Sequence, residues 1–340
     1  MNGYTGKQIY HGEMHEHAAT GGTSDGKMTL TEWNAFREEK GIDFVAILDH
    51  RQVRHMYLPE YQPDHAIFGT EPGTGIPDAD AEEKSMHYNM LFPRREDLEE
   101  LLAEFPEYEF TGGVEGHFVY PKFTRARFAE LIAAVKKRGG MLVHPHPKQL
   151  MRADDPNQYA ITDWIGLETL YENYKSQATK DNYALWLDLL HAGRRIWACA
   201  GCDSHGLAPD VRALTSVYAE GCGSANWLKE LARGNFACGP VGVQMEIGDT
   251  EMGGCRAFAD GDTLSVRLGD AYAPERGKPL RLEVLAGDTD GTEEIVYEGD
   301  YTCGDVWESS FEVDPAKRWY RVVLWDGEDV FGIGNPIWNE

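Results

Sequence analysis

The sequence predicts an α/β domain over residues 1–240, followed by an all-β domain over residues 241–340. Two observations lead to this prediction. In the first part, apolar runs of strand length alternate with amphipathic helical patterns, whereas the second part holds only short strand-like runs. The length of 340 residues agrees with this division, because single hydrophobic cores rarely grow beyond about 250–300 residues.

The predicted strands of the first part are apolar runs, and several lack alternating polar residues, as expected for strands buried on both faces. They cover residues 41–48, 65–69, 87–92, 139–144, 163–170 and 195–201. Helices are predicted where apolar side chains recur three and four positions apart, over residues 95–105, 125–139 and 179–193. This alternation of strands and helices is typical of an α/β domain.

The helical pattern disappears after Gly239 and Pro240. Short runs punctuated by Gly and Asp follow, over residues 262–273, 278–288, 293–301, 306–314, 318–327 and 330–338. This pattern predicts a β-sandwich. We expect it to pack against the first domain, because its strands carry more apolar surface than a lone small sandwich would leave in water. We expect no transition-metal ligand from it, because no histidine follows His205.

Composition excludes several classes of partner. The formal net charge is −25, from 32 Lys and Arg against 57 Asp and Glu, and no basic run occurs, so nucleic acid is not expected to bind. The first residues contain no apolar leader segment, and the longest apolar runs are too short to cross a bilayer. Six cysteines are too few for a disulfide scaffold. We therefore expect a cytoplasmic protein without a membrane partner, and we expect the Cys199 and Cys202 pair to serve packing.

Polar side chains that bind metals recur at the predicted ends of strands. In α/β barrels these ends converge on one mouth, where the chemistry takes place. Nine such candidates are His15, His17, Asp25, His50, Glu71, His87, His144, Asp203 and His205. Each alone is a weak indication, although two histidines two positions apart on a strand point to the same face. Together they predict a metal site with more than one ion.

The chain resembles the PHP superfamily, the polymerase and histidinol phosphatase domain, over residues 8–240. The resemblance rests on short motifs in a fixed order: HGEMHEH, SDG, GIDFVAILDH, FGTE, MHYNMLF, MLVHP, GLETLYEN and GCDSHG. It implies a distorted (β/α)7 barrel, similar to a TIM barrel, with two or three divalent ions at its mouth. The C-terminal part is similar to the β-rich domain of the PHP subgroup that includes carbaryl hydrolase.

The resemblance also implies a set of ligands for each ion. The first ion would be held by His15, His17, Glu71 and Asp203, the second by a bridging Glu71 with His87 and His144, and the third by Asp25, His50 and His205. The chain departs from the family pattern in three places. Glu13 replaces a usual Asp, the loop before Asp25 is about three residues longer, and Arg51 replaces a common Asn, which places a fixed cation near the substrate.

The expected chemistry is hydrolysis. Imidazole nitrogens with a bridging carboxylate suit Zn, Mn or Fe, and two such ions convert a shared water into a bridging hydroxide. No serine or cysteine nucleophile motif is present. We assign the catalytic role to Glu71, Asp203, His205 and Arg51. Around them, His146 and Lys148 are candidates for binding phosphate, Glu168 for hydrogen bonding to a ligand histidine, and Glu115 and His117 for lining the pocket.

Three functions follow from this site. The first is a phosphoesterase that acts on a small anionic substrate, which the superfamily resemblance favours. The second is a metallohydrolase of a carbamate, ester or amide, which the C-terminal resemblance favours. The third is a metal-holding accessory module without turnover. Basic residues at the mouth would favour the first function, and an apolar mouth the second.

Overall fold

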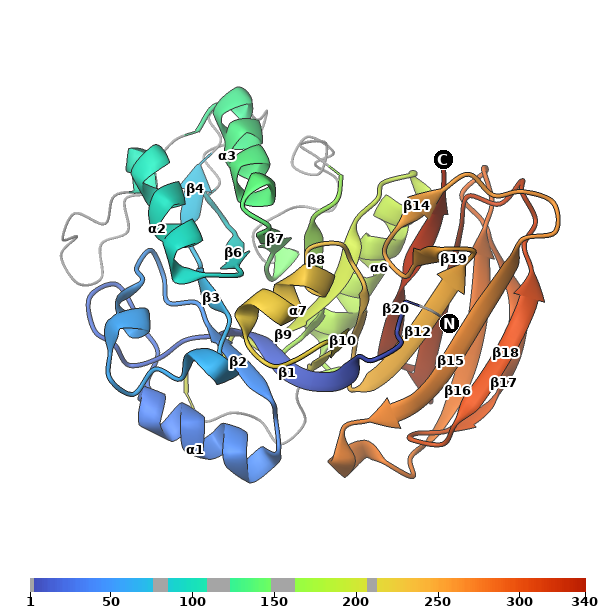
Figure 1. The fold of residues 1–340 in the computed structure, drawn as a ribbon, viewed down its shortest axis with the longest axis horizontal. Helices are drawn as coiled ribbons and strands as arrows, with labels where there is room; N and C mark the ends of the chain where they lie inside the picture. Colours follow the sequence, from blue (N-terminus) through green and yellow to red (C-terminus); the bar gives the residue numbers. More distant parts are fainter. Residues whose placement is uncertain (1–2, 76–84, 109–122, 148–162, 207–212) are drawn as a thin grey trace.

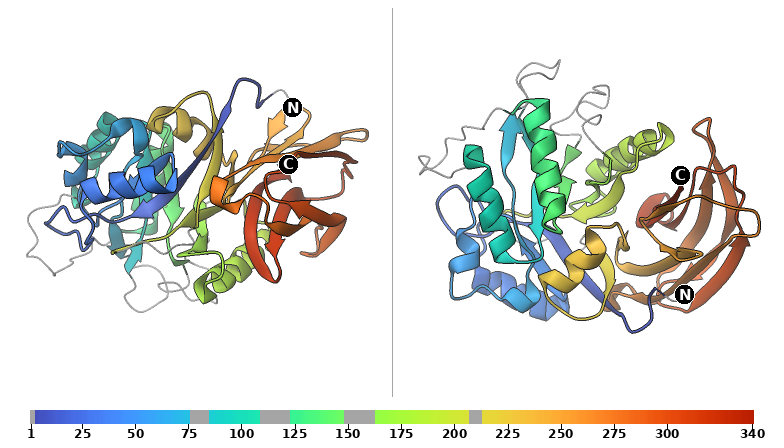
Figure 2. Two further views of the ribbon diagram at one scale, coloured as in Figure 1. Left: turned by 90° about the horizontal axis from the view of Figure 1, so that it is seen from below. Right: turned by 45° about the horizontal axis from the view of Figure 1, so that its top comes forward.

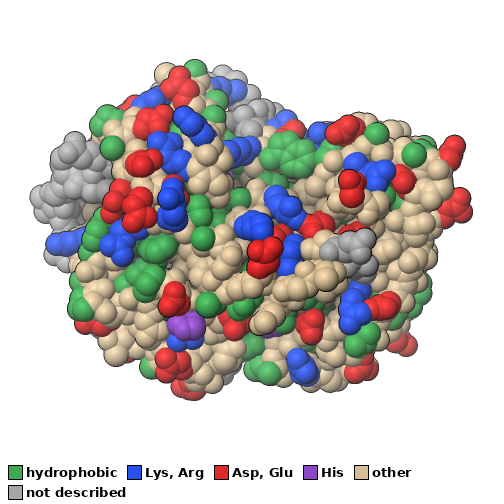
Figure 3. All heavy atoms as spheres, in the orientation of Figure 1, with side chains coloured by type: hydrophobic (Ala, Val, Ile, Leu, Met, Phe, Trp, Pro, Cys, Tyr) green, Lys and Arg blue, Asp and Glu red, His purple; other side chains and the backbone are tan. Residues whose placement is uncertain are grey.

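The computed structural model describes residues 3–75, 85–108, 123–147, 163–206 and 213–340. Figure 1 shows helices packed around strands in the N-terminal part and strands at the C-terminal end of the molecule. Among the described residues, no helix is long and apolar enough to cross a membrane. On the face drawn in Figure 3, basic and acidic side chains are interspersed.

The first part contains every strand and helix predicted for it, with ends displaced by at most three residues. Its elements are β1 (Gln8–Glu16), α1 (Leu30–Lys40), β2 (Phe44–Ile47), β3 (Phe68–Thr70), β4 (Gly73–Gly75), β5 (Ser85–His87), β6 (Asn89–Phe92), α2 (Arg95–Glu104), α3 (Arg125–Lys137), β7 (Met141–His144), β8 (Gly166–Tyr171), α6 (Gln177–His191), β9 (Trp197–Gly201), β10 (Thr215–Ala219), α7 (Ser224–Leu231) and β11 (Phe236–Cys238). The apolar faces of α2, α3 and α6 join the strands in one hydrophobic core.

The second part is a β-sandwich. Its strands are β12 (Val241–Ile247), β13 (Thr250–Glu251), β14 (Cys255–Arg256), β15 (Thr263–Ala271), β16 (Pro279–Gly287), β17 (Glu293–Thr302), β18 (Trp307–Glu312), β19 (Trp319–Asp326) and β20 (Asp329–Asn339). Strands β13, β12, β15 and β18 form one sheet, and β17, β16, β19 and β20 belong to the other. Both views in Figure 2 place these strands together at one end of the molecule.

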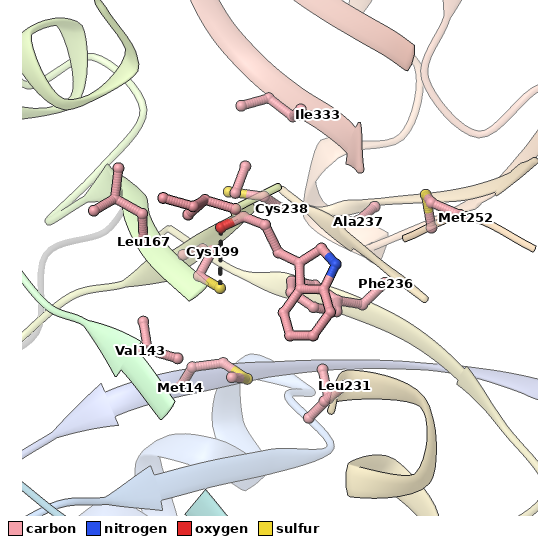
Figure 4. Close-up of a cluster of buried hydrophobic side chains, with 14 of the residues drawn as sticks. Met14, Val143, Leu167, Cys199, Leu231, Phe236, Ala237, Cys238, Met252 and Ile333 are labelled. Atoms are coloured by element: carbon pink, nitrogen blue, oxygen red, sulfur yellow. Dashed lines mark hydrogen bonds between the residues drawn. The ribbon is translucent and has the colours of Figure 1, made fainter. Parts of the chain in front are cut away.

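One sheet runs through both parts of the chain. Its strand order is β17-β16-β19-β20-β11-β10-β1-β2, with β14 beside β20. The link is β11, in which Ala237 pairs with Gly334 and Cys238 with Ile333 of β20. The buried side chains in Figure 4, from Met14 on β1 to Ile333 on β20, pack across this link. The two parts therefore share backbone hydrogen bonds and a core as well as a surface contact.

The structure corrects the expectation of a closed (β/α)7 barrel. Five of the remaining strands of the first part form an open sheet in the order β3-β6-β7-β8-β9, in which β6 is antiparallel to both neighbours. Strands β4 and β5 form a separate two-stranded sheet. Among the described residues, the two sheets are joined only by isolated bridges, such as Val45 with Ala66 and Glu16 with Ser204. Strand β2 has four residues and β3 has three. The polar strand ends gather where the two sheets meet.

Candidate metal centre

Glu71 lies at the centre of the histidine cluster and is fully buried. It directly follows β3, and its backbone pairs with that of His50 in an isolated bridge between the two sheets. Its two carboxylate oxygens face imidazole nitrogens of five histidines: His50 (2.8 Å), His87 (2.9 Å), His146 (3.1 Å), His17 (3.2 Å) and His15 (3.4 Å). One carboxylate therefore contacts histidines from four separate segments of the chain.

His15 lies in β1 and His17 directly follows it, and Nε2 of both histidines faces Glu71 Oε2, as their spacing predicts. His15 Nδ1 lies 2.7 Å from Glu168 Oε1, and a carboxylate at this distance fixes the proton on Nδ1. The Nε2 atom of His15 then faces Glu71 (3.4 Å) and Asp203 (3.5 Å), and these carboxylates with Glu168 raise the pKa of His15 well above its usual value although it is buried. Nε2 has no hydrogen-bond partner among the described residues. A divalent cation bound between these three groups would take the place of the Nε2 proton.

Asp203 is held in place by three contacts. Its backbone N–H donates to His15 O (2.8 Å), Oδ1 faces His17 Nε2 (2.9 Å), and Oδ2 accepts a hydrogen bond from Tyr171 (2.7 Å). Its φ of 51° lies in the left-handed region, where a non-glycine residue is uncommon. Such backbone strain is tolerated where surrounding contacts determine the conformation, as they do here.

Asp25 and His205 form the more exposed side of the cluster. Asp25 Oδ1 lies 3.1 Å from His205 Nε2 and 3.5 Å from His50 Nε2. The ring of His17 lies between those of His205 and His50, with centroid distances of 4.2 and 4.3 Å. The Asp25 side chain is 52% exposed, whereas that of His17 is fully buried. The lengthened loop therefore still brings Asp25 into the cluster, at its solvent side.

The structure does not bring His144 to Glu71, and His146 occupies that position. His144 ends β7 and packs against the ring of Tyr88 (4.9 Å), away from the carboxylates. His146 Nε2 lies 3.1 Å from Glu71 Oε1, and its backbone N–H donates to Glu168 Oε2 (2.6 Å). The φ of 31° at His146 turns the chain after β7, so the strand alternation no longer decides where its side chain points.

Opposite charges reinforce one another in this cluster. Burial alone would raise the pKa of Glu71, but His50, His15 and His87 hold that pKa well below its usual value. Burial would lower the pKa of His50, yet Glu71 and Asp25 raise that pKa to about 9. The pKa of His144, by contrast, falls to about 3 because burial disfavours its charged form. Without a metal, the carboxylates of the cluster favour the protonated form of His15, His50, His146 and His205, because they raise the pKa of each.

Three groups of side chains have ligand atoms close enough together to hold an ion. They are His15, His17, Glu71 and Asp203 (the inner group), His50, Glu71 and His87 (the middle group), and His17, Asp25, His50 and His205 (the outer group). The donor set of imidazole and carboxylate, in which the buried Nε2 of His15 faces two carboxylates and has no hydrogen-bond partner among the described residues, fits divalent transition metals. Glu71 belongs to two groups, as a bridging ligand must.

A fourth buried group, of Glu13, Glu16 and Cys202, has a different character. Glu16 Oε2 accepts a hydrogen bond from the backbone N–H of Ser204 (2.9 Å), and the Cys202 thiol donates to Glu172 O (3.1 Å). Burial and the nearby Glu13 raise the pKa of Cys202 well above its usual value. Because its thiol is buried and donates to a backbone carbonyl, we interpret Cys202 as a packing residue.

Other residues singled out from the sequence are placed as follows. Arg51 is half-buried, has a φ of 52°, and its backbone N–H donates to Glu71 O (3.1 Å). Glu168 contacts both His15 and His146, as a residue supporting ligand histidines would. Lys148, Glu115 and His117 lie outside the described residues. Sequence reasoning missed Tyr171, whose hydroxyl donates to Asp203. The only feature of the sequence that pointed to Tyr171 was its position in the same strand as Glu168, three residues later.

Comparisons with known proteins add little to this picture. No family model and no curated protein matches the chain. One similar structure is an amidohydrolase from Chromobacterium violaceum with bound sulfate and no metal (14% identity, TM-score 0.41, 60% of this chain and 90% of that chain). Another is a proposed metal-dependent phosphoesterase from Bifidobacterium adolescentis (18% identity, TM-score 0.33, 59% of this chain and 90% of that chain). These similarities are too loose to transfer an activity, so we argue function from the site itself.

Proposed function

We propose that this protein is a metal-dependent hydrolase of the PHP type that acts on a small phosphorylated molecule. The observation that carries the proposal is the position of Glu71, one buried carboxylate within 3.4 Å of five histidines from four segments. Burying a carboxylate among imidazoles costs free energy of folding, and a cluster that binds a ligand gives a reason for this cost. Divalent cations match its donors and its charge.

Each group would hold its ion through different segments of the chain. The inner group would use the end of β1 with Glu71 and Asp203, and the middle group His50, Glu71 and His87 with the adjacent His146. The outer group would use Asp25 and His205 together with His17 and His50. Two or three ions of Zn, Mn or Fe, when bound, would lower the pKa of a coordinated water and accept charge from a phosphoryl oxygen.

The side chains around the outer group support an anionic substrate. The side chain of Lys27 is exposed, and its backbone N–H donates to His205 O (2.9 Å). Arg54 is also exposed and lies against the lengthened loop, where a Cβ on Gly22 would come within 3.0 Å of its Nη1. Arg51 directly follows His50. These cations would bind and orient a phosphate on the solvent side of the cluster, in a chain whose net charge of −25 would otherwise repel it.

The proposal is tested on the full-length protein after metal removal and reconstitution with Zn, Mn or Fe. Elemental analysis gives the number of ions per chain, and a panel of phosphomonoesters, phosphodiesters, aryl esters and carbamates gives the reaction class. We expect more than one ion per chain and turnover of phosphomonoesters. The matched control pair is Glu71→Gln, which should abolish turnover, and Glu60→Gln at an exposed position, which should not.

Each other result has a distinct meaning. Turnover of carbamates or aryl esters without phosphoesters would refute the substrate class and retain the hydrolase. Uptake of less than one ion per chain, or metal binding with no turnover of any substrate in the panel, would count against the hydrolase itself. In the second case the accessory module would become the better interpretation.

A further inference from the structure

Asp49 is a fully buried carboxylate beside the metal centre that belongs to none of the three candidate groups. It follows β2 and directly precedes His50. Its oxygens face the loop of residues 18–26, which joins His17 to Asp25 and contains the extra residues of this chain. A buried carboxylate needs hydrogen-bond donors, and here the loop supplies them.

Both ends of the loop are attached to Asp49. Next to His17, the backbone N–H of Ala18 donates to Asp49 Oδ1 (2.8 Å). Next to Asp25, the Ser24 hydroxyl lies 3.0 Å from the same oxygen and 2.5 Å from Ala18 O. The hydroxyl of Thr20 donates to Asp49 Oδ2. One carboxylate therefore joins the two ends of the loop.

The neighbours of Asp49 secure the middle of the loop. Gln52 Nε2 donates to Gly21 O (2.7 Å) and to Thr20 Oγ1 (3.0 Å). The Thr23 hydroxyl donates to the carbonyl of His50. Gly22 has a φ of +68°, and a Cβ there would lie 2.6 Å from Gln52 Oε1, so the loop passes closely over the segment that carries Asp49.

Asp49 is thus linked to three of the four outer-group residues, to two through a residue next to each and to the third as its direct neighbour in the chain. It binds Ala18 beside His17, binds Ser24 beside Asp25, and precedes His50 in the chain. The fourth member, His205, contacts the residue that follows the loop, because its carbonyl accepts the backbone N–H of Lys27 (2.9 Å). Since Asp25 is half exposed, its position depends on these contacts and not on surrounding packing.

We propose that Asp49 is a positioning residue for the outer group. It fixes the loop so that Asp25 meets His50 and His205 at a distance at which the group binds a divalent cation. This inference rests on the proposed metal centre. Asp49 itself has no contact with the ion and no part in proton transfer. Loss of Asp49 should selectively weaken the binding of the ion in the outer group.

The test is a metal titration of the full-length, chelator-treated protein with Mn²⁺ alone, followed by competition with a chromophoric chelator. We expect Asp49→Ala to keep the tightly bound ion or ions and to weaken the weakest one by about 10- to 100-fold, the range seen for residues that support ligands. Asp25→Asn, which removes the ligand itself, should affect the same ion. The double variant should bind that ion no more weakly than Asp25→Asn alone, because Asp49 acts on the ion through the position of Asp25.

A milder variant and a control keep the test decisive if Asp49→Ala folds poorly. Ser24→Ala removes one contact to Asp49 and should weaken the same ion several-fold, whereas Asp64→Asn, an exposed carboxylate, should change no ion. Amide hydrogen exchange of residues 18–26 should accelerate in Asp49→Ala and in Ser24→Ala. The proposal is overturned if Asp49→Ala and Ser24→Ala bind every ion like the wild type while Asp25→Asn loses one, or if the effects of Asp25→Asn and Asp49→Ala add. Since the readout is binding, absence of turnover in the wild type would refute the hydrolase and leave this result standing.

Discussion

Replacing Glu71 by Gln is the sharpest single test of the metal centre. The amide keeps the size and shape of the carboxylate, but it removes one negative charge and places an NH2 donor where an acceptor stood. Because Glu71 faces five histidines and is fully buried, no water can take over the role of the lost oxygen. The two groups that share Glu71, the inner and the middle group, should both be affected.

The size of the effect follows from the burial of the pair. Removing one partner of a buried, hydrogen-bonded charge pair costs about 3–5 kcal/mol. Each 1.4 kcal/mol is a factor of about ten in an equilibrium constant, so we expect metal affinity to fall by at least about 100-fold. Arg51→Ala provides the comparison, because an arginine beside the site can assist substrate binding without holding an ion. It should keep the metal content and raise KM.

The assay combines elemental analysis with steady-state kinetics of the reconstituted protein. Circular dichroism and thermal unfolding of the metal-free variants show whether each one is folded. We expect Glu71→Gln to retain the fold, to lose metal and to lose turnover together. If it keeps the wild-type metal content and rate, Glu71 is not a bridging ligand and the arrangement proposed for the three groups is wrong.

Four further predictions follow. His146→Ala should lower metal content and His144→Ala should not, as measured by elemental analysis; the reverse result would restore the assignment made from the sequence. Tyr171→Phe should weaken the inner ion about tenfold in a chelator competition while leaving the fold intact, because Asp203 loses its hydroxyl contact; unchanged affinity would show that the contact is dispensable. Burial lowers the pKa of His11 to about 4. Between pH 6.5 and pH 4 the His11 imidazole therefore binds a proton in the unfolded chain but not in the folded protein. His11 should contribute a loss of roughly 3 kcal/mol of stability between pH 6.5 and pH 4, and His11→Gln should lessen the dependence of stability on pH in urea unfolding; an equal dependence would refute this cause. A chain ending at residue 240 should aggregate, because β11 loses its partner β20; a soluble, metal-binding fragment would contradict this.

The sequence by itself determined the strands and helices of the first part and most of the cluster around Glu71. Apolar periodicity is a local property, so it located β7, β8, β9 and the helices between them to within a few residues. The spacing of His15 and His17 was also sufficient, because side chains two positions apart on a strand share a face. Asp25 and His205, which the resemblance assigns to the same ion, lie together at the solvent side.

Three other features were decided by the tertiary structure alone, and the alternation of side chains along a strand predicts none of them. His146, not His144, faces Glu71, because β7 ends at His144 and the backbone turns at His146. The barrel is open and one sheet runs into the C-terminal part, because pairing between β11 and β20 depends on contacts about one hundred residues apart in the chain. Asp49 belongs to none of the three candidate groups, because its oxygens are held by Ala18, Thr20 and Ser24 of the folded loop, with His55 facing Oδ2 (3.5 Å).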